Sequence, residues 1–421
     1  MTLNLDEKEW PIPPEQEARF QNEGRKKLLL YRSNYIKSAF VEEGHIQTRN
    51  LGPKHFTRPI PPEESAIGAL VRDRRGRIFG GTGGKRSHLF FYDPAPDADT
   101  IVDIGIIADN ARVTSLAAHP DGRIFGVTES LDGEGSGEIF VYKPCEYLFK
   151  SFKFEYGEGE ARKVMDTPPQ DMVMSTIDDA YHANGRIEKL AEPIPSEGIS
   201  SLVMSSDSRY LYGMSNKHSH LFCYDIERNE TKIAGRADDT DEYSLPLVIA
   251  DDGLIYGAKA EGRLFRYIPE TEEIEDLPQR IPSLKGRELY SRVDSWAKDE
   301  ESPLIYGGTN DGLLFIMDTE AGSIINLGKP VKEERIRALT VGLDGRVYGI
   351  GGEENGCAHL FNYNPQTREL RDLGVPLAAV EEHWYGYEFT AAVTGKWGEI
   401  YLGEADRISH LFIYYPPILR S

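Results

Sequence analysis

The sequence predicts an all-β protein, a seven-bladed β-propeller with four antiparallel strands in each blade. Three observations support this fold class. A short strand reading approximately Arg-Ile-Tyr-Gly recurs along the 421 residues, and a strand reading approximately His-Leu-Phe-x-Tyr follows each copy. The copies recur at roughly 40 to 50 residues, and four short antiparallel strands at that period are typical of a propeller blade.

The second strand of each blade is the most easily recognised. An Asp-Gly dipeptide often precedes it, as at Asp121-Gly122 and Asp344-Gly345. Asp-Gly tolerates the positive φ values of a tight hairpin turn, so these strands are expected to follow hairpins. The copies of the second strand begin at Arg77, Arg123, Tyr210, Leu254, Leu304, Arg346 and Glu399.

The third strand is apolar on both faces, as expected where each blade packs between two neighbours. A weaker fourth strand follows it in several of the repeats. The third strands begin at His88, Glu138, His220, Arg263, Leu313, His359 and His410. The fourth strands that can be recognised begin at Ile101, Ile274, Ile324 and Leu370.

The last repeat has no fourth strand after residues 410–414. The segment HIQTRNLG, from His45 to Gly52, reads like the missing strand. We therefore expect an N-terminal strand to complete the last blade, which closes the ring and removes an exposed strand edge. The propeller then spans residues 45–421, and residues 1–44 form an N-terminal extension that wraps the ring or contacts a second copy in a homo-oligomer.

One interval between repeats is about twice as long as the others, from Gly126 to Gly213. Residues 145–186 contain no strand of the Arg-Ile-Tyr-Gly type, and RIEKL from Arg186 reads as a delayed fourth strand. We interpret residues 145–186 as an insertion in blade 2, and a degenerate eighth blade is the alternative. Long loops in compact domains often carry function.

The net charge of −21 disfavours nucleic acid and anionic membranes as partners. No segment approaches the length of a membrane-spanning run. The first twenty residues contain no apolar run, so we expect a cytoplasmic protein, or a secreted or periplasmic one if a signal sequence has been removed. An anionic ligand remains compatible with this charge if basic residues gather locally.

The loops that enter the innermost strands of a propeller emerge on one face, around a central funnel. In this chain they carry many Arg, Tyr, His and Trp residues. Arg pairs with carboxylates, aromatic rings stack on sugars, and His or Tyr can move protons. The alternative is that these are ordinary loop residues and that the aromatic ones plug the funnel. We assign substrate binding to Arg112, Arg292, Arg335, Arg337 and Trp384, and catalysis to Tyr243, Tyr290, His383, Tyr385 and the insertion residue His182.

Histidines at the start of third strands form a second candidate site. His359, His410 and His88 belong to consecutive blades, and His220 lies in blade 3. Equivalent positions in neighbouring blades are about 10 Å apart, so they cannot all bind one ion. The alternative is a structural histidine, repeated in each blade and bonded to the backbone of the next. The sequence requires no cofactor, and a divalent metal such as Ca²⁺ or Zn²⁺ is compatible with it.

The strings RIFGGT from Arg77, HLFFYDP from His88 and LIYGGT from Leu304 resemble blade motifs of known enzymes. These enzymes are the seven-bladed propellers among polysaccharide lyases and related glycan-cleaving proteins, of the ulvan-lyase and rhamnose–glucuronate-lyase types. The resemblance covers residues 45–415 at the level of the repeat. No catalytic motif aligns, so it transfers no site residue.

The resemblance implies a carbohydrate-active enzyme, a lyase that cleaves acidic poly- or oligosaccharides by β-elimination. In that reaction a cation neutralises the uronate carboxylate, a base removes the adjacent proton, and an acid protonates the leaving oxygen. The funnel residues supply Arg for the first role and His or Tyr for the others. Two alternatives are a non-catalytic propeller that binds a protein or glycan, and a glycoside hydrolase on the same scaffold.

Overall fold

A computed structural model describes most of the repeat region. Its regular structure consists of strands and two short 3-10 helices, η5 (Ala260–Gly262) and η6 (Glu288–Tyr290). Among the described residues no helix is long and apolar enough to cross a membrane. The described residues are 41, 43–51, 60–94, 100–144, 154–156, 163–165, 186–238, 246–352, 357–378, 384–406 and 409–417.

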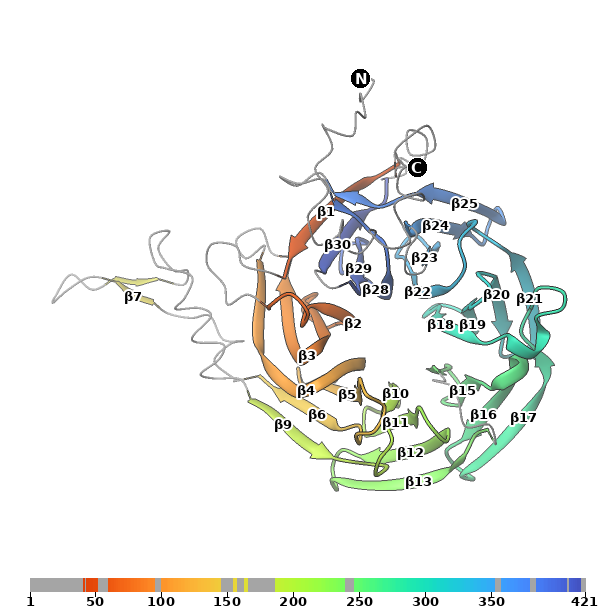
Figure 1. Ribbon diagram of the computed structural model, residues 1–421, viewed down its shortest axis with the longest axis horizontal. Helices are drawn as coiled ribbons and strands as arrows, with labels where there is room; N and C mark the ends of the chain where they lie inside the picture. The colour runs from red at the N-terminus through yellow and green to blue at the C-terminus, as the bar shows by residue number, and fades with distance from the viewer. Residues whose placement is uncertain are drawn as a thin grey trace, which may run out of the picture.

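The sheets stand side by side around an open centre, which confirms the propeller architecture (Figure 1). Four of them have the predicted form, with four antiparallel strands hydrogen-bonded in chain order. Two of these sheets comprise β10 (Ile199–Met204), β11 (Tyr210–Ser215), β12 (His220–Asp225) and β13 (Glu230–Arg236), and β14 (Leu247–Ile249), β15 (Ile255–Ala258), β16 (Arg263–Ile268) and β17 (Glu273–Arg280). The other two comprise β18 (Val293–Lys298), β19 (Leu304–Thr309), β20 (Leu314–Asp318) and β21 (Ser323–Gly328), and β22 (Ile336–Val341), β23 (Val347–Gly351), β24 (His359–Asn364) and β25 (Glu369–Gly374).

An N-terminal strand closes the ring, as predicted. Strand β1 (His45–Asn50) pairs antiparallel with β30 (His410–Tyr415), and the sheet continues through β29 (Ile400–Glu404) to β28 (Phe389–Thr394). The Tyr414 hydroxyl donates a hydrogen bond to the carbonyl of Glu43, just before β1. The outer edge of the last sheet is therefore covered by a segment from the other end of the described chain.

The prediction of seven separate blades is wrong, because the described residues form six sheets around the ring. Two long strands join the first two predicted blades into one six-stranded sheet. Strand β3 (Ile78–Asp93) continues without a break from the predicted second strand into the third. Its middle pairs with β4 (Thr100–Ala118), as in Gly83 with Arg112 and Arg86 with Asp109. Counted as continuous sheets, the propeller is six-bladed. The joined sheet comprises β2 (Ala66–Arg72), β3 (Ile78–Asp93), β4 (Thr100–Ala118), β5 (Ile124–Ser130), β6 (Ile139–Lys143) and β9 (Arg186–Ala191).

Side-chain hydroxyl groups tie the innermost strands to one another. Thr114 in β4 donates to the Ile199 carbonyl of β10 at 2.6 Å, and Ser295 in β18 donates to the Ile336 carbonyl of β22 at 2.6 Å. Thr390 in β28 donates in the same way to a carbonyl of β2. These bonds fix the positions of neighbouring innermost strands. The loops that lead into those strands are therefore held around one axis.

A glycine of the second strand lies beneath a phenylalanine of the third in several sheets. Gly213 pairs across the strands with Phe222, and Gly257 pairs with Phe265. A Cβ atom built on Gly213 would lie only 2.6 Å from Cε1 of the Phe222 ring. The Tyr-Gly and Leu-Phe parts of the two repeated motifs therefore encode one packing unit, in which glycine leaves the space that the ring fills.

Two predicted segments lie largely outside the described residues and stay predictions. In the N-terminal extension, 1–44, only Val41, Glu43 and Gly44 are described. In the insertion, 145–186, the description covers Arg186 and a two-stranded sheet of β7 (Phe154–Tyr156) and β8 (Lys163–Met165). The predicted delayed fourth strand is present, because β9 pairs with β6. A second small sheet joins β26 (Leu377–Ala378) to β27 (Trp384–Tyr385).

Candidate functional site

A cavity of about 760 Å³ is lined by residues of the innermost strands and of the turns that enter them. It corresponds to the predicted funnel, since its walls come from β2, β4, β10, β14, β18, β22 and β28. All four predicted binding arginines line it: Arg112, Arg292, Arg335 and Arg337. The sequence had placed them in entering loops of three different repeats, and the closed ring brings them to one space.

Each arginine contacts a carboxylate of the cavity wall. Arg112 binds Glu129 through Nε and Nη2 at 3.0 and 2.8 Å, and Arg337 pairs with Glu388. Arg335 makes a bidentate pair with Asp294 at 2.7 and 2.8 Å. Such two-point contacts set the plane of the guanidinium group, so the arginines are held in defined orientations.

Asp294 contacts two guanidinium groups. Besides Arg335, Arg292 approaches it with Nε 3.6 Å from Oδ1. Two positive charges against one carboxylate favour the approach of a second anion at this corner of the cavity. The cavity as a whole is not basic, because Glu63, Glu129 and Asp406 also line it. The surplus positive charge of Arg292 and Arg335 at Asp294 is therefore the feature that can orient an anionic ligand.

Arg337 offers a hydrogen-bond donor in the same wall. Its Nε is buried and donates to no acceptor among the described residues. An unpaired buried donor costs free energy, and a ligand oxygen would remove that cost. Arg337 lies two residues after Arg335, and both line the cavity at the start of β22.

Most of the predicted catalytic residues, and the predicted binding residue Trp384, lie where the structure does not describe their side chains. Tyr290 is in η6, is 68% exposed and does not line the cavity. The side chains of Trp384 and Tyr385, in β27, lie outside the description. Tyr243, His383 and His182 also lie outside the described residues. The assignment of a base and an acid to these residues stays a prediction.

The acidic residues of the cavity were missed by the sequence reasoning. Asp294 follows Arg292 by two residues, and the period of two along a strand could have indicated that both face the axis. Glu129 and Glu388 offered no comparable signal, because Glu129 meets Arg112 from the adjacent strand β5 and Glu388 meets Arg337 from a neighbouring sheet. Trp296 was also missed; it lines the cavity and its Nε1 donates to the Pro246 carbonyl at 3.1 Å.

Three of the predicted metal candidates bind carboxylates in their own sheets. His88 lies between Glu64, 3.0 Å from Nε2, and Asp103, 3.1 Å from Nδ1. His359 Nδ1 is 3.1 Å from Asp372, and His410 Nδ1 is 2.9 Å from Glu404. The expected structural alternative, a bond to the backbone of the next blade, is thus replaced by a contact with a carboxylate of the same sheet.

His88 is expected to stabilise the protein most strongly when it is protonated. Burial lowers its pKa, but hydrogen bonds and charge from Asp103 and Glu64 outweigh burial and raise it above the ordinary 6.5. A raised folded pKa gives stability that is complete below the unfolded pKa and is lost as pH rises through the folded value. In denaturant titrations the free energy lost in His88→Gln should therefore be largest near pH 6 and shrink toward pH 9. His45→Gln, at an exposed site, should retain the wild-type slope. A loss that grows with pH would contradict this assignment.

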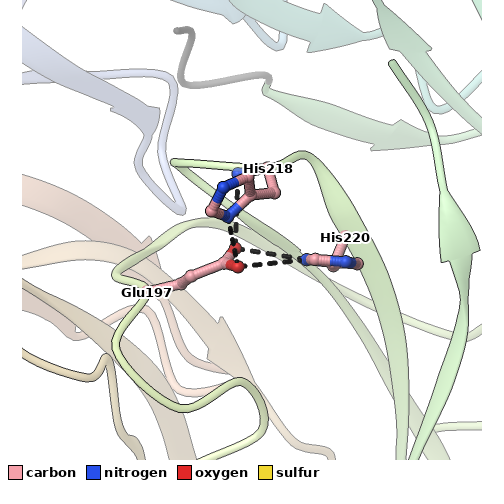
Figure 2. A group of neighbouring side chains, drawn as sticks. All are labelled: Glu197, His218 and His220. Carbon is pink, nitrogen blue, oxygen red and sulfur yellow. Dashed lines mark hydrogen bonds and ion pairs between the residues drawn. The ribbon is translucent and has the colours of Figure 1, made fainter. Parts of the chain in front are cut away.

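A different arrangement surrounds the fourth histidine of the set, His220. Its Nδ1 lies 3.2 Å from Oε1 of Glu197, and Nδ1 of His218 lies 2.7 Å from the same oxygen. Figure 2 shows the two imidazoles converging on one carboxylate. Glu197 is in the turn before β10, and the histidines are in the turn before β12 and at its first residue. Sequence reasoning had grouped His220 with the other histidines and had missed its two partners.

The carboxylate of this cluster is held in its charged form. Burial would raise the pKa of Glu197, but hydrogen bonds from Ser215, His218 and His220 outweigh it and lower the pKa. The backbone N–H of His218 also donates to Oε2 at 3.3 Å. Glu197 therefore presents a fixed negative charge to both imidazoles.

The turn that carries His218 also contacts the cavity wall. Asn216, in the same turn, donates through Nδ2 to Oε1 of Glu129 at 2.6 Å. The other oxygen of Glu129 accepts from Arg112. The turn of the Glu197 cluster is therefore fixed against one carboxylate of the cavity.

Comparison with known proteins supports the fold. No protein-family model matches the chain, and no curated protein sequence matches it. Among solved structures it is similar to a catalytically inactive variant of virginiamycin B lyase from Staphylococcus aureus crystallised with quinupristin, with a TM-score of 0.60, 9% identity, and coverage of 88% of this chain and 99% of that one. At this identity the likeness shows a shared propeller fold and nothing more.

Two other similar structures come from B. thetaiotaomicron. One is the extracellular domain of a protein described as a hybrid two-component system, with a TM-score of 0.54, 15% identity, and coverage of 87% of this chain and 39% of that one. The other is a second structure of the extracellular domain of the same protein, there described as a one-component system, with a TM-score of 0.56, 15% identity, and coverage of 87% and 40%. This neighbour is a propeller as well, so the likeness again concerns the fold.

Proposed function

We propose that the protein binds an acidic carbohydrate in its central cavity and cleaves it as a lyase. The observation that carries this proposal is the contact of both Arg292 and Arg335 with Asp294, with Arg337 lining the same cavity. A uronate carboxylate that displaces part of the Asp294 contact would be bound by a bidentate guanidinium group. The resemblance of the blade motifs to glycan-cleaving lyases supports the same assignment.

The chemistry that this geometry suits is β-elimination. Neutralising the carboxylate makes the proton on the adjacent carbon more acidic. A base removes that proton, the electron pair forms a carbon–carbon double bond, and the bond to the glycosidic oxygen breaks as an acid protonates the oxygen. Among the described residues that line the cavity there is no His or Tyr. The base and acid are therefore sought among His182, Tyr243, His383 and Tyr385.

The decisive test is an activity screen on uronate-containing poly- and oligosaccharides. The purified protein would be incubated with each substrate in chelator and, separately, with added divalent metal. We expect ultraviolet absorbance from the unsaturated product together with new reducing ends. New reducing ends without absorbance would instead identify a glycoside hydrolase. The absence of both signals under every condition would overturn the enzyme assignment.

A non-catalytic role is the second candidate, because each arginine of the cavity already contacts a carboxylate. A site that only binds a ligand needs no catalytic base or acid, and it can function with arginines that are already paired with carboxylates. Calorimetric titration with the same oligosaccharides distinguishes the two roles. Binding without turnover would support a glycan-binding propeller, and binding with turnover supports the lyase.

A further inference from the structure

We propose that Glu197, His218 and His220 form a binding site for one divalent transition-metal ion, with Zn²⁺ as the best-matched metal. The three side chains offer two imidazole nitrogens and one carboxylate oxygen, all within 4.8 Å of one another. Two histidines and one glutamate are a recurrent zinc ligand set. The inference is independent of the lyase proposal, since none of the three residues lines the central cavity.

The spacing of the ligand atoms suits a tetrahedral ion. Zinc lies about 2.0 to 2.1 Å from nitrogen and oxygen ligands, which places two ligands of a tetrahedron about 3.4 Å apart. In the structure Oε1 of Glu197 lies 2.7 Å from Nδ1 of His218 and 3.2 Å from Nδ1 of His220. Small rotations of the two rings would open the space that an ion needs, without a change in the backbone.

The supporting contacts hold the ligands in position. His220 is the first residue of β12, and its backbone N–H donates to Oγ of Ser215 at 2.9 Å. Ser215 also hydrogen-bonds Glu197, so one hydroxyl orients two ligands. Outer contacts of this kind fix ligand geometry at metal sites and raise affinity. Glu197 is buried, whereas the two imidazoles are about one-third exposed, which leaves a path for the ion and an open position for water.

The β10–β13 sheet lacks a carboxylate that the histidines of two other sheets contact. Asp103 and Asp372 lie opposite Phe90 and Phe361, and each binds the histidine of its own sheet. The equivalent position in the β10–β13 sheet, opposite Phe222, is Ile233. The fourth strand therefore supplies no carboxylate to His220.

His218 supplies the second contact of the cluster instead. In the joined sheet the residue two before the histidine is Arg86, which binds Glu64. Here the corresponding residue is His218, which binds Glu197 and whose imidazole, unlike a guanidinium group, can bind a metal. The exchange of Asp for Ile on the fourth strand and of Arg for His in the turn therefore leaves two imidazoles and one carboxylate together.

The test is metal binding by the full chain after removal of metal with a chelator. Titration with Co²⁺, whose visible absorption reports tetrahedral coordination, should saturate at one equivalent, and Zn²⁺ should displace it. His218→Ala and His220→Ala should weaken binding by more than the roughly 10- to 100-fold that loss of an outer contact costs. His45→Ala removes an exposed histidine elsewhere and should bind as the wild type does.

Two outcomes would overturn the site. One is a wild-type protein that binds no stoichiometric Co²⁺ or Zn²⁺, and the other is a His218→Ala variant that binds as tightly as the wild type. His218 lies in an exposed turn, so its variant should fold even if His220→Ala does not. Glu197→Gln gives a further measurement, because it keeps the shape of the side chain and removes the anionic ligand. Thermal melts should show stabilisation by Zn²⁺ in the wild type and not in the three variants.

Discussion

Arg337→Met is expected to lower kcat/KM on a cleaved uronate substrate by roughly 100- to 1,000-fold, the loss typical when one donor to a developing negative charge is removed. Methionine replaces the aliphatic stem of arginine and keeps much of its apolar packing, so the main change is the loss of the guanidinium group. Arg337 lines the cavity and its buried Nε has no acceptor among the described residues. The measurement is the initial rate of ultraviolet absorbance at several substrate concentrations.

Arg209→Met is the matched control for this variant. Arg209 pairs with Asp225 at 3.0 Å, and its Nε is also buried without a hydrogen-bond acceptor among the described residues. It lies outside the cavity lining. Equal losses in the two variants would mean that the effect of Arg337 is structural. Retained activity in Arg337→Met would remove this residue from the binding site.

Arg337→Lys separates charge from geometry. Lysine restores the positive charge beside Glu388 but has no fork of parallel donors. We expect it to recover protein stability more completely than activity. Full recovery of activity would show that charge alone is needed, and the bidentate recognition of a carboxylate would then be excluded.

Gly213→Ala is expected to reduce the free energy of unfolding by about 1 to 3 kcal/mol, the usual cost of overpacking a core. The new methyl group would overlap the ring of Phe222, and the three atoms nearest to the built Cβ all belong to that ring. In an open strand the same substitution would stabilise the protein by about 0.5 to 1 kcal/mol, because alanine loses less backbone entropy than glycine on folding. A decrease in the free energy of unfolding therefore indicates the contact with the Phe222 ring, and an increase indicates its absence. Denaturant titration of the wild type and the variant measures it.

A double-mutant cycle with Phe222→Ala tests the cause. Phe222→Ala alone should cost about 3 to 5 kcal/mol, since it removes a fully buried ring. In that background the space above Gly213 is empty, so Gly213→Ala should become neutral or stabilising. Additive losses in the double variant would disprove the packing unit that we infer from the repeated motifs.

The strands could be predicted from the local sequence pattern, because the contacts that stabilise them form within one repeat. The Gly213–Phe222 contact joins two strands linked by one turn, and its residues recur in both motifs. Closure by β1 could also be predicted, because His45 to Gly52 carries the fourth-strand pattern that the last repeat lacks. The joining of two blades could not be predicted. It depends on the pairing of Gly83 with Arg112, between residues that the motif treats as loops.

Only part of the candidate site could be predicted from the sequence. It predicted four arginines around the axis, because loops at equivalent positions of a ring meet at its centre. It did not predict their partners, since Arg335 reaches Asp294 and Arg337 reaches Glu388 across neighbouring sheets. The cluster of Glu197 with His218 and His220 was also missed, because two strands, β10 and β11, separate Glu197 from the histidines along the chain.

By itself the sequence determined an all-β propeller, the strands that build it, the N-terminal strand that closes it and the arginines that face its centre. Those properties follow from residue types repeated at short range, where turn residues, strand period and glycine–phenylalanine packing act within one unit. Only the tertiary structure decided that the ring has six continuous sheets, that Asp294 lies between two arginines, and that two histidines share Glu197. These features depend on contacts between neighbouring repeats or between turns that are far apart in the sequence. The partner in such a contact is known only when the chain has folded, so the repeated motif does not predict it.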